Sequence, residues 1–558
     1  MTIDFNKIPD LNPLYIDYIS DFTKLSNFFE YNFNSQDDFK KCILTKKESY
    51  NSSDINRTDL SILLHKQNTF FNSSLKTFEN IKSLEESNTF AVVTGQQVGI
   101  LSGPLYTVYK AINTIQLAEK LNYEFSEYKF VPVFWLEADD HDFLEINNIN
   151  LINKENNLVN VKYFENGTEQ EKYLKPVANI LIDEFFNSFK NEVSNLLSKT
   201  DFSEELENRI DRSYRIGTQL NTAFARFLNS LFDDFGLILF DPTDPEAKSI
   251  ASPLFKNELN SFPKVCEIVV DTSAKLEQYY EPQIKPKPLN LFYNYNGNRY
   301  LLEPKDDSSI GLKNSRQKFT VEELNDSLNA DASLFSPNVI LRPIVQDYIF
   351  PTVAYIAGPS ELAYFAQFKG VYNHFDIPMP VIYPRTSVTL IENKVKNFID
   401  KYEITFTDFF NSKELNDKLL KISNVANIDD IFNSYIDEIN ATNYKMENIL
   451  ELIDKNLTIN FKNRNLKNIE GLNPLKQKFL DAQLKQNDVV FKKLKSILVN
   501  VYPENKLQER VLNISYFINK YGFNLIRFLK DNIKITGFDH QLIELNLINE
   551  NNIASNNN

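Results

Sequence analysis

The chain has 558 residues, and its 75 Asp and Glu residues outnumber its 60 Lys and Arg residues, for a net charge of −15. This balance argues against a broad phosphate-binding surface, so we expect no nucleic-acid partner, although a local basic patch is compatible with it. No apolar run approaches the roughly 20 residues that cross a bilayer, and the N-terminus lacks a signal-peptide pattern. Two cysteines, Cys42 and Cys266, are too few for a disulfide framework. We therefore expect a cytoplasmic protein with no membrane partner.

The most informative stretch is residues 90–110. An apolar run that starts at Phe90 ends at Gly95, a glycine-spaced loop follows, and a helix is expected from near Pro104 to about Leu121. Ligands of open α/β sheets bind at the carboxyl ends of strands, and a following helix N-terminus favours phosphate or carboxylate. The glycine spacing matches neither common nucleotide motif, so a plain strand-to-helix turn is an equal alternative.

A second strand is predicted at Phe130–Trp135, and the intervening helix makes a βαβ unit with parallel strands and a right-handed crossover. Four acids and a histidine follow this strand directly: Glu137, Asp139, Asp140, His141 and Asp142. We interpret them as a polar site for a cation, an ammonium group or a sugar. The alternative is a solvated loop whose aspartates cap a helix.

Two segments interrupt the α/β pattern. The first, from residue 148, has a hairpin-like stretch over 149–173 followed by helices, and the sheet resumes at 236–240. The second, 261–333, is rich in proline and in short aromatic strands. We interpret both segments as insertions into one core.

The pattern of residues 90–110 recurs further along the chain. Val353–Ile356 is a predicted strand, a Gly-Pro loop follows, and a helix is expected from near Ser360. Two such loops can face each other across a switch-point crevice. Arg342 and Arg385 are suited to hold a carboxylate or phosphate in bidentate fashion, with a structural salt bridge as the equal alternative for each.

The chain changes character after the last predicted core strand at 381–383. No proline occurs between Pro384 and Pro474, and apolar residues at heptad steps predict two long helices, the second capped by Asn473. Asn487 lies in the predicted seam, where a polar residue can fix the register. We expect an antiparallel coiled-coil arm that forms a symmetric dimer, with an unpartnered helical subdomain as the alternative. The heptad positions are Tyr435, Ile439, Thr442, Met446, Ile449 and Ile453 in the first helix, and Leu480, Leu484, Phe491, Leu494, Leu498 and Val501 in the second.

Four strings of this sequence resemble the bacillithiol biosynthesis cysteine-adding enzymes, the BshC family. They are Thr94–Lys110, Val131–Asp142, Arg342–Asp347 and Ala357–Tyr364, and only Ser360 departs from the expected glycine. The resemblance implies a core akin to a class I aminoacyl-tRNA synthetase and dimerisation through the coiled coil. It also implies addition of cysteine to glucosaminyl-malate, the last step to bacillithiol, and it supplies no established catalytic residues.

The expected fold class is α/β: a Rossmann-like parallel sheet core with two connecting insertions and a long antiparallel coiled-coil helical arm. The boundaries are 1–147 for the first half of the core with N-terminal helices, 148–228 for the first insertion, 229–260 for the core continuation, 261–333 for the second insertion, 334–392 for the second half of the core, 393–505 for the arm, and 506–558 for C-terminal helices and a disordered tail.

Joining a carboxylate to an amine in water is uphill, so we expect activation by ATP, through either an adenylate or an acyl phosphate. We expect ATP or ADP with Mg²⁺, and no zinc, because the cysteines and histidines show no metal-ligand spacing. The expected nucleotide-binding residues are Gly95, Gln96, Gln97, Gly99, Ser102, Gly103, Gly358, Pro359 and Glu361. The expected catalytic residues are Asp139, Asp140 and His141, which hold the amine and supply a general base, and Arg342 and Arg385, which stabilise negative charge.

Two other functions fit the same sequence. One is a nucleotide-dependent ligase for another amino acid or acceptor on the same core. The other is a non-catalytic coiled-coil assembly protein whose core only binds a nucleotide. The polar groups clustered at three strand ends favour an enzyme.

Overall fold

The computed structural model describes residues 1–53, 55–140, 142–163, 175–306, 309–422, 427–486 and 488–545. The predicted catalytic His141, the predicted seam residue Asn487 and the predicted disordered tail lie outside these ranges. Residues 1–390 and 506–558 form one compact unit, and residues 391–505 form the other.

The first unit is built on a five-stranded parallel sheet with the order β13-β12-β2-β3-β6. The strands are almost entirely buried, as the unbroken apolar runs of their sequences require in a sheet covered on both faces. This sheet confirms the predicted Rossmann-like core. Its strands are β2 (Thr89–Gln97), β3 (Lys129–Glu137), β6 (Ile238–Phe240), β12 (Thr352–Ala357) and β13 (Val381–Pro384).

Strand β2 is longer than its apolar run predicts. It pairs with β3 in register through Gln97 opposite Glu137, so Gln96 and Gln97 belong to the strand end and not to the loop. The following helix, α5 (Leu105–Glu124), begins one residue after the predicted Pro104. It packs against β2, β3 and β12 and is buried on nearly all sides, which explains its apolar residues on several faces.

The strand order contains a switch point between β2 and β12. From β2 the chain proceeds through α5 to β3 and later to β6 on one side, whereas from β12 it proceeds to β13 on the other. The polar ends of β2 and β12 therefore lie next to each other at the carboxyl edge, as predicted. Thr94 Oγ1 donates a hydrogen bond to the Ile356 carbonyl across this junction at 3.0 Å.

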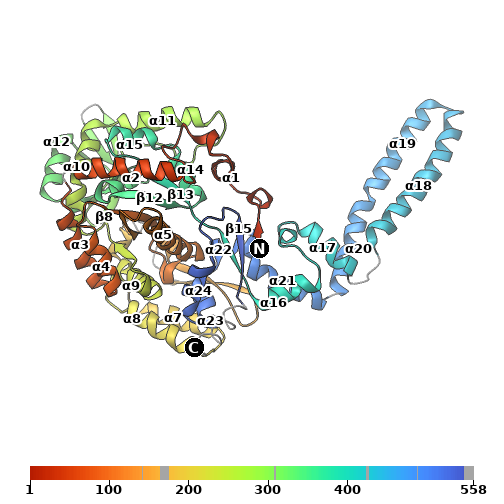
Figure 1. The fold of residues 1–558 in the computed structure, drawn as a ribbon. Coiled ribbons are helices and arrows are strands. Elements are labelled where there is room, and N and C mark those ends of the chain that lie inside the picture. Colours follow the sequence, from red (N-terminus) through yellow and green to blue (C-terminus); the bar gives the residue numbers. More distant parts are fainter. Residues whose placement is uncertain are drawn as a thin grey trace. The chain divides into compact units, whose positions relative to one another are not determined.

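Helices surround this sheet (Figure 1). Those before β2 include α2 (Gln36–Asn51), which packs on β12, and α3 (Arg57–Phe70), which packs on β6. After β3, the predicted hairpin forms from β4 (Asn148–Ile152) and β5 (Leu158–Lys162). The other N-terminal and inserted helices are α1 (Pro13–Ser20), α4 (Leu75–Ser83), α6 (Phe143–Ile146), α7 (Phe185–Leu196), α8 (Ser203–Ser213) and α9 (Leu220–Phe232).

The second predicted insertion contains a five-stranded sheet with the order β10-β9-β8-β7-β11, in which all neighbours are antiparallel. Its described residues also include the helices α11 (Lys264–Leu276) and α12 (Val321–Ala330), which proline and aromatic content did not reveal. The helix α10 (Pro245–Ser261) precedes the predicted bounds 261–333 almost entirely, and the edge strand β11 (Phe335–Pro337) follows them. The other strands of the sheet are β7 (Leu291–Tyr295), β8 (Asn298–Asp306), β9 (Ser309–Leu312) and β10 (Lys318–Phe319).

The remaining elements of the first unit bring the C-terminal segment back to the sheet. α22 (Gln508–Val511) and α24 (Asn524–Asn532) both pack against α5. The other elements are α13 (Leu341–Ile349), α14 (Pro359–Phe365), α15 (Lys369–His374), β14 (Val388–Ile391), α23 (Ile514–Tyr521), β15 (His540–Glu544) and β1 (Thr2–Ile3), which pairs with β15.

The second unit is helical and contains the predicted antiparallel hairpin, visible as α18 and α19 in Figure 1. The chain reverses at residues 452–454, not before Asn473, which lies in the first turn of α20. The helices are α16 (Asn393–Lys401), α17 (Ser412–Ile422), α18 (Ile428–Glu451), α19 (Lys455–Glu470), α20 (Leu472–Gln486) and α21 (Asp488–Val501).

The predicted heptad residues of the first long helix do not all pack within one chain. Met446 and Ile453 are 49% and 70% exposed, whereas Phe432 is buried and its ring contacts Phe479 with centroids 5.8 Å apart. Heptad spacing fixes which residues share a helix face. It does not identify the face that meets the returning helix, because that depends on where the chain turns.

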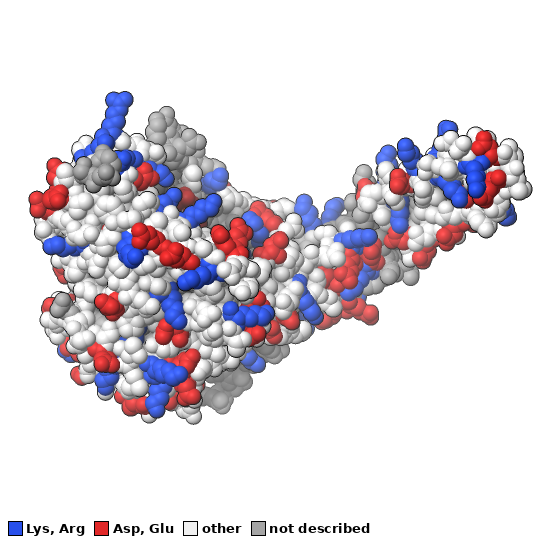
Figure 2. All heavy atoms as spheres, turned by 90° about the horizontal axis from the view of Figure 1, so that it is seen from above, with Lys and Arg blue, Asp and Glu red and all other residues white. Residues whose placement is uncertain are grey.

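Charged side chains of both signs are interspersed over the face drawn in Figure 2. Within the described ranges, no helix is both long and apolar enough to cross a membrane. Both cysteines carry free thiols, with Cys42 buried.

Candidate functional site

A cavity of about 1040 Å³ opens at the carboxyl edge of the central sheet. Its floor is formed by the ends of β2, β3, β12 and β13, and one wall comes from the second insertion. The loops after β2 and β12 thus meet at one cavity, as the recurring strand-loop-helix pattern predicts. The insertion contributes Lys285, Lys287, Phe292, Arg299, Tyr300 and Lys313.

Most of the predicted site residues line this cavity. Gly99 and Gly103 line a smaller cavity beside it, together with Gln96 and Gln97. Asp139 and Ser102 are buried and line neither cavity. The predicted residues that line the large cavity are Gly95, Gln96, Gln97, Asp140, Arg342, Gly358, Pro359, Glu361 and Arg385.

A buried ion pair joins the two loops of the switch point. Lys110 Nζ on α5 lies 2.5 Å from Glu361 Oε2 on α14, and it also donates to the Gly95 carbonyl at 2.8 Å. Glu361 accepts further hydrogen bonds from the Gly358 N–H and the Tyr355 hydroxyl. Burial would raise the pKa of Glu361, but Lys110 and the Gly358 N–H hold it below its usual range. Lys110 was not among the predicted site residues, although a lysine in so apolar a helix was a signal.

Glu137, the last residue of β3, belongs to the acidic cluster that the sequence indicates but was not among the expected catalytic residues. Its Oε2 lies 3.4 Å from Arg342 Nε and has no hydrogen-bond partner among the described residues. Burial raises the pKa of Glu137 to about 7, with Asp139 and Asp140 contributing, while Arg342 and Arg299 oppose the rise. A carboxyl group that titrates near neutrality inside a cavity is suited to accept and return a proton.

Arg342 extends from α13 to the cavity floor. Besides Glu137, its guanidinium donates to the Gln346 side-chain oxygen at 3.1 Å and to the Tyr364 hydroxyl at 3.2 Å. Arg342 therefore combines a structural attachment with a position beside the acid, so it can stabilise negative charge that develops there.

Asp140 and Asp139 are adjacent in sequence but serve different partners. Asp140 accepts a hydrogen bond from Gln97 Nε2 at 2.7 Å and lies 3.6 Å from Arg299 NH1 of β8. Asp139 is buried and pairs with Lys248 of α10 at 2.5 Å. The structure thus places Asp140 at the cavity and Asp139 behind it.

Arg385 makes a bidentate ion pair with Glu509 of α22. The distances are 2.6 Å and 3.0 Å, both side chains are buried, and Glu509 also accepts from the Val388 N–H. Arg385 lines the cavity, but its guanidinium also attaches the C-terminal segment to the end of β13. This is the structural alternative that the sequence left open for Arg385.

The large cavity carries an excess of positive charge in an acidic protein. Eight basic and four acidic side chains line it, an excess of four positive charges. Among the described residues, Lys285, Lys287, Lys313 and Arg510 form no ion pair, whereas three of the four acids are paired with cavity cations. Low-dielectric walls of one sign concentrate ligands of the opposite sign, so the cavity is suited to anionic ligands. Within the described ranges, no group of three or more His, Cys, Asp or Glu side chains is placed to hold a metal ion.

The sheet, the switch-point cavity and the helical hairpin define a Rossmann-like α/β protein with a coiled-coil domain. Residues 1–386 match the family model described as bacillithiol biosynthesis BshC, N-terminal Rossmann-like domain, and residues 388–545 match the BshC C-terminal coiled-coil domain. The chain belongs to the BshC family.

Curated relatives with the name "Putative cysteine ligase BshC" support this assignment. The protein of Chloroherpeton thalassium is 35% identical over 87% of this chain and 88% of its own length. The protein of Chlorobaculum tepidum is 33% identical over 85% of this chain and 86% of its own length. The protein of Salinibacter ruber is 31% identical over 95% of this chain and 96% of its own length.

Proposed function

We propose that the protein is a cysteine ligase that joins the carboxyl group of cysteine to the amine of glucosaminyl-malate, which completes bacillithiol. The observation that carries the proposal is the large, positively charged cavity at the switch point. Its size suits more than one reactant, and its cations suit the carboxylates of a malate group. Family membership and the names of the relatives agree with this reaction.

Activation of the cysteine carboxyl requires a nucleoside triphosphate, for which ATP is our candidate. Lys285, Lys287 and Lys313 fit its phosphates, because they line the cavity and form no ion pair among the described residues. Mg²⁺ would arrive with the nucleotide, held mainly by its phosphates and by water. When bound, the nucleotide would supply a good leaving group on the cysteine carboxyl.

The residues of the chain itself would then manage the proton of the acceptor amine. The amine reaches the site as an ammonium ion and attacks only after losing a proton. Glu137, with its pKa near neutrality, would accept that proton, and Arg342 would stabilise the negative charge that develops on the carboxyl oxygen. Asp140, held by Gln97 and Arg299, would orient the ammonium group before transfer.

We also propose that the protein is a homodimer through its helical hairpin. Tyr444, Met446, Ile449 and Ile453 expose between 49% and 70% of their surface, although they lie in or beside the long helices. Exposed apolar side chains in such a run are typical of a surface that another protein covers, and a second copy of the chain is the simplest partner. The free thiols fit a reducing cytoplasm.

The decisive experiment incubates the purified protein with cysteine, glucosaminyl-malate and Mg²⁺, with ATP, with GTP or without nucleotide, and detects bacillithiol by mass spectrometry. We expect product with ATP, and the released AMP or ADP identifies the activation route. ATP binding without turnover on any thiol acceptor would contradict the ligase and favour the assembly function. Product with a different amino acid and none with cysteine would favour the other ligase.

A further inference from the structure

A second, smaller pocket of about 210 Å³ adjoins the large cavity. It lies between the loop after β2, the first turn of α5, the hairpin strand β4 and the C-terminal α22. Gln96, Gln97, Tyr106, Glu145 and Arg510 line both cavities, so the two share a common wall. Its volume lies below the roughly 300–1,000 Å³ of pockets for drug-sized ligands, so it suits a small molecule better than a nucleotide.

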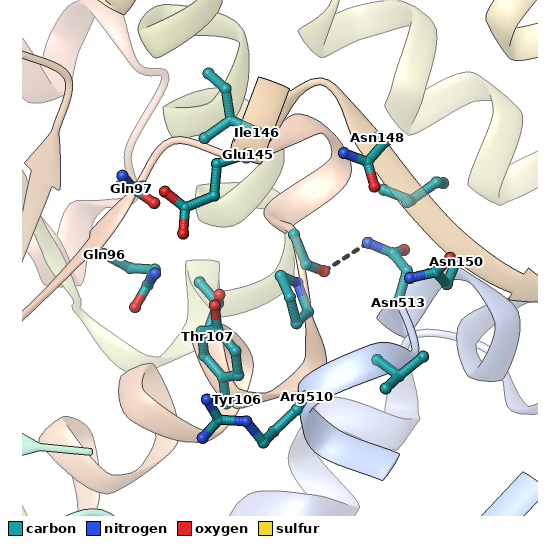
Figure 3. A pocket seen from close by; sticks show the side chains of 15 residues that line it. Gln96, Gln97, Tyr106, Thr107, Glu145, Ile146, Asn148, Asn150, Arg510 and Asn513 are labelled. Atoms are coloured by element: carbon teal, nitrogen blue, oxygen red, sulfur yellow. Dashed lines mark hydrogen bonds between the residues drawn. The ribbon is translucent and has the colours of Figure 1, made fainter. Parts of the chain in front are cut away.

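The pocket contains one acid and one base on opposite sides. Figure 3 shows Glu145 of α6 on one side and Arg510 of α22 on the other, with Tyr106 and Thr107 between them. Neither charged side chain forms an ion pair with any described residue, and both residues are exposed. Burial raises the pKa of Tyr106 most, while Arg510 lowers it and Glu145 raises it, so both charges act on this hydroxyl.

The lining of the pocket includes a buried threonine and a set of apolar surfaces. Thr107 is fully buried, and its Oγ1 has no hydrogen-bond partner in the described part of the chain. A buried hydroxyl without a partner is costly, so a small shift of this first helical turn that lets a ligand reach Oγ1 would be favourable. Ile146, Ile149 and Val511 supply apolar surface on the walls.

We propose that this pocket binds the zwitterion of a small α-amino acid, with Glu145 facing its ammonium group and Arg510 facing its carboxylate. The proposal rests on the proposed function for the identity of that amino acid, which is cysteine. Two opposite charges without ion-pair partners in one small pocket are complementary to a zwitterion and to neither a simple anion nor a simple cation. Because Arg510 also lines the large cavity, the carboxylate lies at the junction, where a nucleotide in the large cavity can reach it.

The test compares cysteine with two analogues that each lack one charge: 3-mercaptopropionate, without the ammonium group, and cysteamine, without the carboxylate. Dissociation constants are measured by calorimetry on the full chain under reducing conditions, with and without a non-hydrolysable ATP analogue. We expect Glu145→Gln to weaken cysteine binding about tenfold or more and to leave 3-mercaptopropionate within twofold, because the variant loses a charge-assisted hydrogen bond to the ammonium group that only cysteine carries. Arg510→Gln has the reciprocal effect, weakening cysteine but not cysteamine.

Glu155→Gln and Arg212→Gln are the matched controls, because both side chains are exposed and line neither cavity. Wild-type affinity for cysteine in both pocket variants would overturn the proposal, as would equal weakening of cysteine and its analogues. So would the absence of cysteine binding to the wild type in both conditions. Wild-type turnover with unchanged cysteine affinity in the variants would refute the pocket and leave the ligase intact. Selective cysteine binding without any product would support the pocket and refute the ligase.

Discussion

Replacing Glu137 by glutamine tests the proposed proton transfer and is expected to separate activity from stability. The substitution preserves the shape of the side chain and removes the carboxyl group that titrates at about pH 7. Loss of a general base reduces turnover by roughly 10²–10⁴-fold. In the wild type, the rate rises as the pH passes through about 7, and in Glu137→Gln this step is absent.

The same raised pKa predicts that the inactive variant is more stable. Burial raises the pKa of Glu137 from 4.5 to about 7, so between these values the folded state holds a proton that the unfolded state has released. The stability that this proton contributes is present below pH 4.5 and is lost as the pH rises through 7. The difference between a pKa of 4.5 and one of about 7 corresponds to roughly 3.5 kcal/mol at about 1.4 kcal/mol per pKa unit. The side chain is 23% exposed, so we expect a gain of about 1–2 kcal/mol at about pH 8.

The assays are product formation by mass spectrometry across the pH range and urea denaturation of the same preparations. Glu155→Gln, an exposed substitution away from both cavities, serves as the control and should match the wild type in both. Turnover of Glu137→Gln within threefold of the wild type would refute the role of Glu137 as the general base. A lower urea midpoint above neutral pH, together with lost activity, would make Glu137 a structural residue.

Lys110→Met leaves Glu361 buried without its cation, so the free energy of unfolding, measured by urea denaturation, should fall by about 3–5 kcal/mol. The double variant Lys110→Met with Glu361→Gln should recover part of this loss. Equal free energies of unfolding for the single and the double variant would contradict a stabilising role of this ion pair. Burial lowers the pKa of His540 from 6.5 to about 4, so the stability it contributes is present above pH 6.5 and is lost as the pH falls toward 4. His540→Gln should therefore reduce the fall of the urea midpoint between pH 6.5 and about 4. An unchanged pH dependence of the urea midpoint would exclude His540 as the cause of that fall. Met446→Glu with Ile449→Glu should convert the proposed dimer to a folded monomer in analytical ultracentrifugation, and a dimer that persists in the variant would place the interface elsewhere.

The local sequence pattern was sufficient to predict the strands of the core and the helices that follow two of them. Continuous apolar runs identify β2, β3, β6, β12 and β13, and proline near the start of a helix marks the beginning of α5 and α14. Because polar loops follow two neighbouring strands, the switch-point cavity could also be anticipated. Arg342 and Asp140 could be placed near this cavity because each lies in a conspicuous string, and both line it, while their catalytic roles stay predictions.

Other residues reach the cavity from segments whose sequences give no sign of it. Arg299 lies on a strand of the second insertion, and Arg510 follows the entire helical arm in the chain. No local spacing relates either arginine to Asp140 or Glu145. Their positions follow from the packing of the insertion and of α22 against the core.

The sequence by itself determined the fold class, the strand ends at which polar groups gather, and the family. Packing of distant segments makes Asp139 pair with Lys248 while Asp140 faces the cavity, and it pairs Arg385 with Glu509. The same packing buries Glu137 and so raises its pKa to about 7. The physical reason is that strand and helix periodicity is a property of neighbouring residues. Burial, ion pairing and pKa depend on atoms that distant segments bring within a few ångströms.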